Sequence, residues 1–289
     1  VADYIPALAA TPKDLFGICV VATSGDVFSI GDTEYEFSIQ SISKPFVFAL
    51  VSQALSCQQA RYKIGVNATG LPFNSVMAIE LNESRTMNPM VNAGAIATTS
   101  LVPGATADEK WQFIHDGLSR LAGRRLTLNT EVYESEAASN QRNQGIAHLL
   151  EGYGRMYFDP LQATDVYTKQ CSLNVSVRDL AVMGATLADG GVNPLTKERV
   201  LDADRCKRVL AALATAGLYE ESGDWLYEVG LPGKSGVSGG IVTVAPGKGG
   251  LATFAPQLDS AGNSIKGQLV TKFLSERLGL NLFASQAAA

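Results

Sequence analysis

The sequence predicts an α/β (α+β) fold in which one antiparallel sheet is assembled from both ends of the chain. Apolar and polar residues alternate with the period of two that strands show, first near the N-terminus and again in the last quarter of the chain. Between these parts the apolar spacing is helical. We therefore expect one domain over 1–289, with a sheet part formed by 1–40 and 223–289 and an inserted helical part formed by 41–222.

The N-terminal elements are expected to be a short helix, a hairpin and a buried helix. Pro6 stands where a helix can begin. Residues 16–22 read as a strand, and 27–30 return antiparallel to it after a Ser-Gly-Asp turn. The apolar run over 46–56 predicts a helix buried on all sides.

The middle of the chain is expected to hold helices joined by loops. Turn-forming residues predict irregular structure over 61–87, and the segment from Val166 to Ser172 is interpreted as a loop that contains Tyr167. Small or amphipathic patterns predict the helices, which are expected from residue 88 onward and over 108–122, 178–188 and 205–217.

The C-terminal part returns to the strand pattern. We expect strands over 227–231, 241–245 and 249–254, followed by a closing helix over 266–278. A glycine-rich stretch, 234–240, lies between the first two of these strands. Strands at both ends of the chain are expected to pair with each other in one sheet.

Composition excludes several classes of function. The 289 residues are 46% hydrophobic and carry a net charge of −5, with a pI near 5.2 and no basic run, so nucleic acid is not an expected partner. No apolar stretch is long enough to span a membrane. No signal peptide opens the chain, and the missing initiator Met predicts that a longer chain precedes Val1.

The cysteines and histidines lack the spacing of metal or disulfide sites. Cys19, Cys57, Cys171 and Cys206 are far apart, which is typical of a reducing compartment and favours a cytoplasmic location. The two histidines, at 115 and 148, lie in no local motif, so a Ser-His-Asp triad is disfavoured. No metal-ligand cluster and no nucleotide-binding glycine loop is found, and no cofactor is expected.

The stretch around Ser41 and Lys44 carries the clearest chemical pattern. Residues three apart on a helix share a face, so the hydroxyl and the amine can meet. Pro45 restricts the helix start and places Ser41 at or beside the N-terminus, where free N–H groups stabilise negative charge. A buried lysine loses preference for its ammonium form and becomes a better base. A serine before a helix is also an ordinary cap, so this pattern needs a second element.

The second element is Lys234-Ser235-Gly236, about 190 residues later and beside a predicted strand. Penicillin-recognising enzymes carry a serine-x-x-lysine helix facing a Lys-Thr/Ser-Gly strand, with a helical region between the two. The order and the architecture match here. Their Ser-Asp-Asn loop has no counterpart in this sequence.

Further motifs are similar to a narrower family, the serine-dependent glutaminases (bacterial and kidney-type), which share the β-lactamase-like fold. The resemblance covers nearly the whole chain. It rests on Val1-Ala2-Asp3-Tyr4-Ile5-Pro6, Gln40-Ser41-x-x-Lys44-Pro45, Asn88 to Ala95, Glu136 with Asn143, Gly190-Gly191, Gly217-Leu218-Tyr219, Gly230 to Gly240 and Leu258 to Ser264.

The resemblance implies an amidohydrolase that converts L-glutamine to L-glutamate and ammonia. It implies Ser41 as nucleophile, Lys44 as its base, Tyr219 as a group for proton transfer, and the N–H groups of Ser41 and Val237 as the oxyanion hole. It also implies a homodimer or homotetramer. The positions that resemble the family's substrate-binding residues are Tyr4, Ser41, Asn92, Glu136, Asn143, Tyr167, Tyr219 and Val237.

The residue chemistry agrees with these implied roles. A carboxylate at Glu136 suits an α-ammonium group, and Asn and Tyr side chains suit an α-carboxylate. Which of Lys44 and Tyr219 is the main base stays open. The alternatives are a β-lactamase or penicillin-binding acyl transferase, which steady hydrolysis of a β-lactam would reveal, and a sensor that is acylated once and stops.

Overall fold

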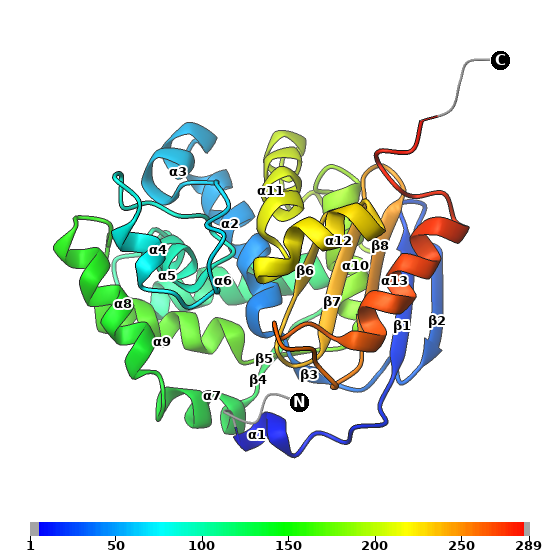
Figure 1. Cartoon of the computed structure of the whole chain (residues 1–289), viewed down its shortest axis with the longest axis horizontal. Coiled ribbons are helices and arrows are strands. Elements are labelled where there is room, and N and C mark those ends of the chain that lie inside the picture. The colour runs from blue at the N-terminus through cyan, green and yellow to red at the C-terminus, as the bar shows by residue number, and fades with distance from the viewer. Residues whose placement is uncertain (1–5, 286–289) are drawn as a thin grey trace.

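The computed structural model describes residues 6–285, apart from the side chains of Pro6 and Ala7, so Tyr4 lies outside the described residues. Its main sheet is antiparallel throughout, with strand order β2-β1-β8-β7-β6 (Figure 1). Strands from the two chain ends therefore pair, as the sequence predicts. Their bounds are β1 Gly17–Ala22, β2 Val27–Gly31, β6 Gly233–Ser235, β7 Gly240–Ala245 and β8 Gly249–Phe254.

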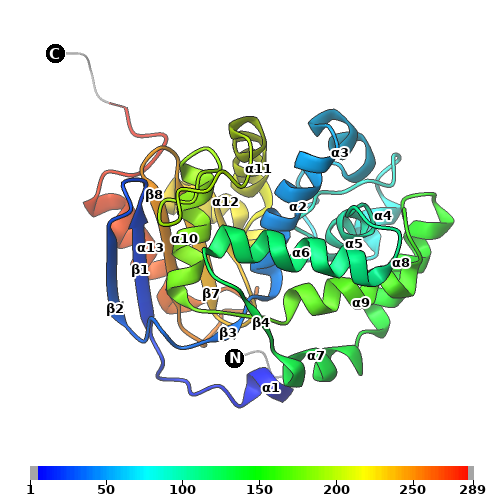
Figure 2. The same ribbon diagram turned by 180° about the vertical axis from the view of Figure 1, so that it is seen from behind.

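Helices cover both faces of this sheet (Figures 1 and 2). Helix α10, Val177–Ala188, packs on β8, β1 and β7. A Cβ added at Gly250 of β8 would lie 2.2 Å from the Ala181 carbonyl oxygen, so only glycine permits this close packing. On the other face lie α13, Ile265–Arg277, and α12, Ser222–Val229, which contact each other.

The helical part is arranged around α2, Ser43–Ala54, which packs against α5, α6 and α11. Ten of its residues are buried, as the apolar run predicts. The remaining helices are α1 Pro6–Ala9, α3 Cys57–Ile64, α4 Met77–Glu80, α5 Asn92–Ser100, α6 Ala107–Ala122, α7 Thr130–Ala137, α8 Gln141–Gly152, α9 Pro160–Cys171 and α11 Ala203–Ala216.

A second, three-stranded sheet leads the chain into the site. Its order is β3-β5-β4, with β3 Phe37–Ser38, β4 Thr127–Leu128 and β5 Leu173–Val175. The chain leaves β3 into a 3₁₀ turn, Gln40–Ile42, and then enters α2. Ser41 is therefore held between a paired strand and a buried helix. A second 3₁₀ turn, Tyr219–Glu221, precedes α12.

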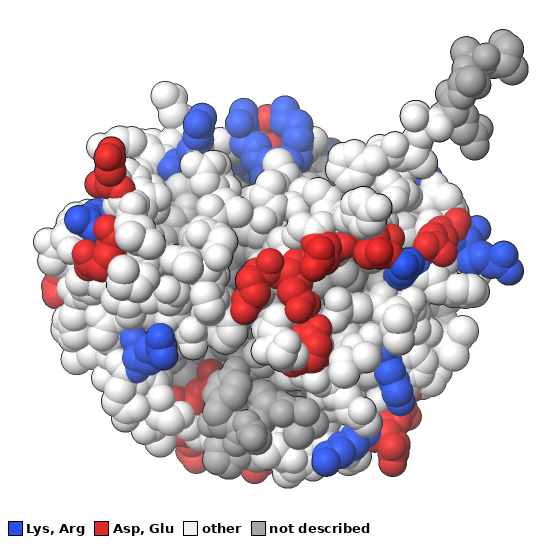
Figure 3. Space-filling model, in the orientation of Figure 1, with Lys and Arg blue, Asp and Glu red and all other residues white. Residues whose placement is uncertain are grey.

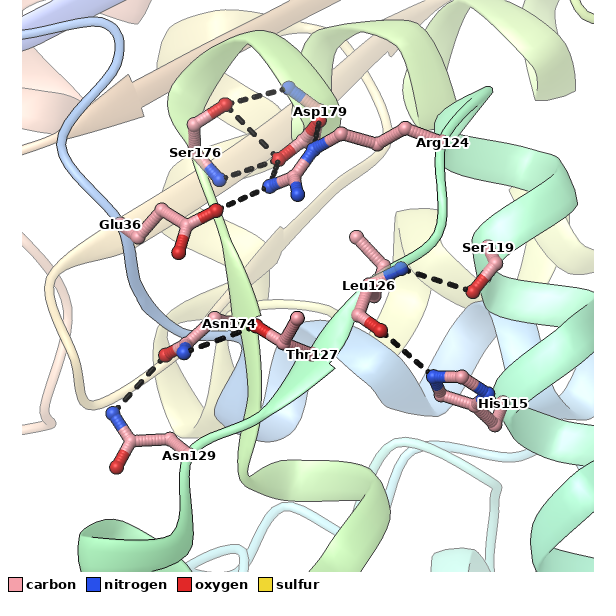
Figure 4. Close-up of polar contacts among 10 residues, drawn as sticks. All are labelled: Glu36, His115, Ser119, Arg124, Leu126, Thr127, Asn129, Asn174, Ser176 and Asp179. Carbon is pink, nitrogen blue, oxygen red and sulfur yellow. Dashed lines mark hydrogen bonds and ion pairs between the residues drawn. The ribbon is translucent and has the colours of Figure 1, made fainter.

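Arg124 ties this small sheet to α10 (Figure 4). Its guanidinium donates to both carboxylate oxygens of Asp179, at 2.8 and 2.6 Å, and to Glu36 at 2.7 Å. Asp179 also accepts from the backbone N–H and the hydroxyl of Ser176, the cap of α10. A bidentate pair of this kind stabilises the junction just before β3.

Arg124→Met is expected to lower the free energy of unfolding by about 1–2 kcal/mol. The change leaves the buried Asp179 carboxylate without its cation, and the cost is moderated because the arginine is itself partly exposed. Urea denaturation measures the effect. Arg125→Met is the matched control, because Arg125 is 73% exposed and its ion pair with Asp116 is long, at 3.9 Å. Equal stability of the two variants would contradict this role for Arg124.

Three predictions about secondary structure are wrong. Residues 166–172 do not form a loop, because α9 extends to Cys171 and its buried Thr164, Thr168 and Cys171 follow one another at helical spacing. The segment 227–231 is not a strand: residues up to Val229 belong to α12, whose buried Trp225 and Val229 are four apart. The irregular region over 61–87 contains the end of α3 and the whole of α4.

Candidate active site

Most of the predicted site residues meet in one pocket. It lies where the start of α2 faces α5, α7, α8 and α9, and its cavity volume is about 280 Å³. Lys44 and Tyr219 each contact a residue of the pocket lining: Lys44 bonds to Asn92, and the Tyr219 ring packs on Phe73, 4.8 Å between centroids. The predicted residues that line the pocket are Ser41, Asn92, Glu136, Asn143, Tyr167 and Val237.

The backbone around Ser41 is arranged for an incoming negative charge. Ser41 follows Gln40, whose φ of 51° is left-handed and rare for a residue with a side chain. Such local strain is often found at functional sites. Within residues 6–285, neither the Ser41 N–H nor the Val237 N–H has a hydrogen-bond acceptor. Two free donors beside a serine hydroxyl are what an oxyanion hole requires.

Lys44 is buried without a carboxylate partner among the described residues. Its Nζ donates to Asn92 Oδ1 at 2.8 Å and to the Met90 carbonyl at 3.3 Å. Burial penalises the ammonium form and lowers the pKa of Lys44 to about 8. A lysine in this environment exists partly as the neutral amine near neutral pH and can accept a proton.

Three of the predicted substrate-binding side chains form a polar network. The Asn92 amide donates to Asn143 Oδ1 at 3.0 Å, and Asn92 Oδ1 accepts from the Tyr167 hydroxyl at 3.4 Å as well as from Lys44. Asn92 is therefore a link between the base and the pocket wall. Burial raises the pKa of Tyr167 well above its usual value, so the phenol stays a neutral donor.

Glu136 of α7 places a carboxylate in the same pocket. Its Oε1 accepts from Gln40 Nε2 at 2.5 Å. Burial raises the pKa of Glu136 to about 7, and the bond from Gln40 opposes that shift. The carboxylate has no cationic partner among the residues described, so an ammonium group in the pocket would stabilise its ionised form.

Tyr219 is the first residue of the short 3₁₀ turn before α12. Its φ is 57°, and its hydroxyl donates to the Ser235 carbonyl at 3.2 Å. Ser235 ends β6, two residues before Val237. The turn and the strand therefore bring Tyr219 and Val237 near each other, and both side chains lie close to Gly262.

Sequence reasoning missed several residues of the pocket. The sequence analysis assigns no role to Gln40, although Gln40 directly precedes the candidate nucleophile, and this adjacency is the signal that points to it. Phe73 lies in a segment interpreted as irregular, and the single cationic side chain among the described lining residues, Arg142, carries no distinctive spacing.

Neither histidine lines this pocket: His115 bonds the Leu126 carbonyl (Figure 4), and His148 is exposed. A larger cavity of about 380 Å³, between α2, α3 and α11, contains none of the predicted site residues.

The fold is of the β-lactamase-like class, and it holds a serine and a lysine at the start of a buried helix. The family model described as Glutaminase matches residues 1–283. The chain is 67% identical over 286 residues to Glutaminase 2 of Yersinia pestis, covering 99% of this chain and 84% of that protein. It is 50% identical to a glutaminase of Brucella canis, covering 99% and 90%.

Solved structures agree with these relatives. A probable glutaminase, ybaS, superposes with a TM-score of 0.97 at 48% identity, covering 98% of this chain and 92% of that one. A Bacillus glutaminase superposes with a TM-score of 0.91 at 33% identity, covering 97% and 96%. The chain belongs to the glutaminase family. It is an enzyme that hydrolyses L-glutamine to L-glutamate and ammonia.

Proposed function

We propose that hydrolysis proceeds by acyl transfer to Ser41, with Lys44 as the base. The neutral Lys44 amine takes the Ser41 hydroxyl proton while Oγ attacks the side-chain carbonyl carbon of glutamine. The observation that carries this proposal is the buried Lys44, three residues after Ser41, with a pKa of about 8 and no carboxylate partner among the described residues.

The N–H groups of Ser41 and Val237 bind the oxyanion of the tetrahedral intermediate. Each donor of this kind contributes roughly 3–4 kcal/mol to the transition state. The C–N bond then breaks, and the departing ammonia receives one proton, either directly from the protonated Lys44 or from Tyr219. If Tyr219 gives it, the proton held by Lys44 passes to the phenolate, so that both residues return to their neutral forms. Water attacks the γ-glutamyl ester and releases glutamate, which regenerates the Ser41 hydroxyl.

The amino-acid end of glutamine is placed against the polar walls of the pocket. The Glu136 carboxylate binds the α-ammonium, and the Asn143 amide and the Tyr167 hydroxyl face the α-carboxylate. Tyr4 stays a candidate for this subsite and lies outside the described residues.

The test is ammonia release from L-glutamine, L-asparagine and D-glutamine. Selective release from L-glutamine is expected, because the carboxamide must reach Ser41 while the α-ammonium and α-carboxylate groups are bound by Glu136, Asn143 and Tyr167. Equal rates with asparagine would contradict the proposed fixed distance between the two ends of the site. Hydrolysis of a β-lactam at a comparable rate would favour the alternative acyl transferase.

Glu136→Gln is expected to raise the KM for L-glutamine about 10–100-fold with little change in kcat. The variant keeps the shape of the side chain but loses the charge that pairs with the substrate ammonium. The wild type should also bind L-glutamine more tightly above pH 7 than below it, because the pKa of Glu136 is about 7 and only the ionised carboxylate pairs with the substrate ammonium. The variant should lose this pH step in kcat/KM.

Glutaramate, which is glutamine without the α-amino group, is the matched control for Glu136. The wild type should strongly prefer glutamine over glutaramate, and Glu136→Gln should lose most of that preference. A variant that retains the full preference would remove Glu136 from the ammonium subsite.

We also propose the organisation in which this chemistry takes place. The chain forms a single catalytic domain that acts as a homodimer or homotetramer in the cytoplasm, without a cofactor. Among the described residues, no helix could cross a bilayer. Acidic side chains form a band over α12 and α13 on the face seen in Figure 3, and such a surface is unsuited to nucleic acid. Size-exclusion chromatography with light scattering tests the assembly.

A further inference from the structure

Lys234 is a buried lysine that the mechanism above does not use. It lies on β6 and has no exposed surface. No carboxylate pairs with it in the described part of the chain. Burying an amine in this way is costly unless its donors are satisfied, so its contacts call for a physical explanation.

Within the described residues, Lys234 donates two hydrogen bonds to backbone carbonyls, one shortly before Tyr219 and the other shortly before Val237. Nζ donates to Gly217 O at 2.8 Å and to Ser235 O at 2.7 Å. Gly217 lies two residues before Tyr219, and Ser235 lies two residues before Val237. One amino group therefore joins the segment that carries the phenol to the segment that carries the oxyanion donor.

The same amine also contacts Tyr219 directly. Nζ lies 4.4 Å from the centroid of the Tyr219 ring, and the Tyr219 hydroxyl shares the Ser235 carbonyl with it. The Tyr219 backbone is left-handed, a conformation that costs about 1–3 kcal/mol and persists only where surrounding contacts enforce it. Gly217 reinforces the junction, because a Cβ there would lie 1.8 Å from the Gly233 carbonyl oxygen.

We propose that Lys234 is a positioning residue that fixes the Tyr219 hydroxyl for proton delivery to the departing ammonia. It acts through the two carbonyls and the ring, and it does not touch the reacting atoms. This inference rests on the proposed function, in which Tyr219 takes part in proton transfer. The proposed function leaves two candidates for the proton donor to the departing ammonia, Tyr219 and Lys44. A phenol held in a fixed orientation by Lys234 favours Tyr219 as that donor.

The chain contains a matched buried lysine away from the pocket. Lys110 of α6 is 4% exposed, donates to the carbonyls of Ser100 and Val102, and lies 4.6 Å from the ring centroid of Phe158. Lys110 therefore has the same kinds of contact as Lys234, two backbone carbonyls and an aromatic ring, but the ring is not that of Tyr219. Lys110→Met therefore reports the structural cost of losing such a group.

The experiment compares two substrates in Lys234→Met, Tyr219→Phe, the double variant and Lys110→Met. L-glutamine releases ammonia, which must receive a proton. The γ-(4-nitrophenyl) ester of glutamate releases a phenolate, which leaves without one. For Lys234→Met we expect kcat/KM to fall about 100-fold for glutamine and less than about 10-fold for the ester. Tyr219→Phe should behave alike, and Lys110→Met should keep wild-type values for both substrates.

The double variant tests whether the two residues act as a unit. It should be no slower with glutamine than the worse single variant, because effects that pass through one group do not multiply. Equal losses for both substrates in Lys234→Met, or multiplied losses in the double variant, would overturn the proposal. If Tyr219→Phe itself fails to distinguish the substrates, the proposed role of Tyr219 is wrong and the inference about Lys234 falls with it.

A second variant covers the case in which Lys234→Met does not fold. Lys234→Ala leaves a cavity, and methylammonium or ethylammonium should restore glutamine turnover at least about fivefold by returning the donors. Circular dichroism checks folding in each case. A folded Lys234→Ala protein whose activity no amine restores, with equal losses on both substrates, would also overturn the assignment.

Discussion

Ser41→Ala is expected to reduce turnover of L-glutamine by at least about 10⁴-fold. Without the hydroxyl no γ-glutamyl ester can form, and the pocket retains only its capacity to bind and polarise the amide. Folding should be unaffected, because the Ser41 hydroxyl has no hydrogen bond among residues 6–285. Ammonia release measures the loss, and mass spectrometry of acid-quenched wild type should detect a glutamyl adduct absent from the variant.

Ser52→Ala is the control on the same helix. Ser52 is buried at the other end of α2, and its hydroxyl lacks a partner in the described part of the chain, so its removal should leave both activity and stability near wild type. Turnover above about 1% in Ser41→Ala, with Ser52→Ala active as expected, would leave the glutaminase assignment intact and place the nucleophile elsewhere.

The parts of the fold that could be predicted from the sequence are those with local causes. The strands of residues 241–245 and 249–254 are short, mostly apolar runs that are buried at every position and are joined by a tight turn, and α2 is a mostly apolar, buried helix. The Ser41–Lys44 spacing is also local, since both residues lie at one helix start. These elements need no knowledge of distant neighbours.

The parts that could not be predicted depend on tertiary contacts. The segment around Tyr167 is predicted as a loop, yet it is helical, and its buried Gln170 side chain bonds to Ser43 and Thr99 on two other helices. The contact between Asn92 and Lys44 joins residues 48 positions apart, and no pattern at either position records it. The resemblance to a family indicates which residues belong to the site, and the structure adds the hydrogen bonds and the burial from which their chemistry is inferred.

Lys44→Met is expected to lower kcat about 10³–10⁴-fold while leaving the KM within a few-fold of wild type. The methionine keeps most of the side-chain volume but cannot accept the Ser41 proton. In Glu136→Gln, which should lack the step near pH 7, kcat/KM should still rise through about pH 8 and level off above it, because only the neutral amine is a base and the pKa of Lys44 is about 8. A profile that is flat from pH 6 to 9 would exclude Lys44 as the base.

Stability distinguishes this loss from misfolding. Lowering the lysine pKa from 10.5 to about 8 means that ionised Lys44 destabilises the fold by about 3 kcal/mol at pH 7. The penalty is relieved as the pH rises from about 8 to 10.5, where the folded chain releases a proton that the unfolded chain keeps. After the lost hydrogen bonds are subtracted, Lys44→Met should be about 1–2 kcal/mol more stable at pH 7 by urea denaturation, yet inactive. An inactive variant that is also much less stable would contradict this prediction, because an ionisation penalty would then not be what Lys44 contributes.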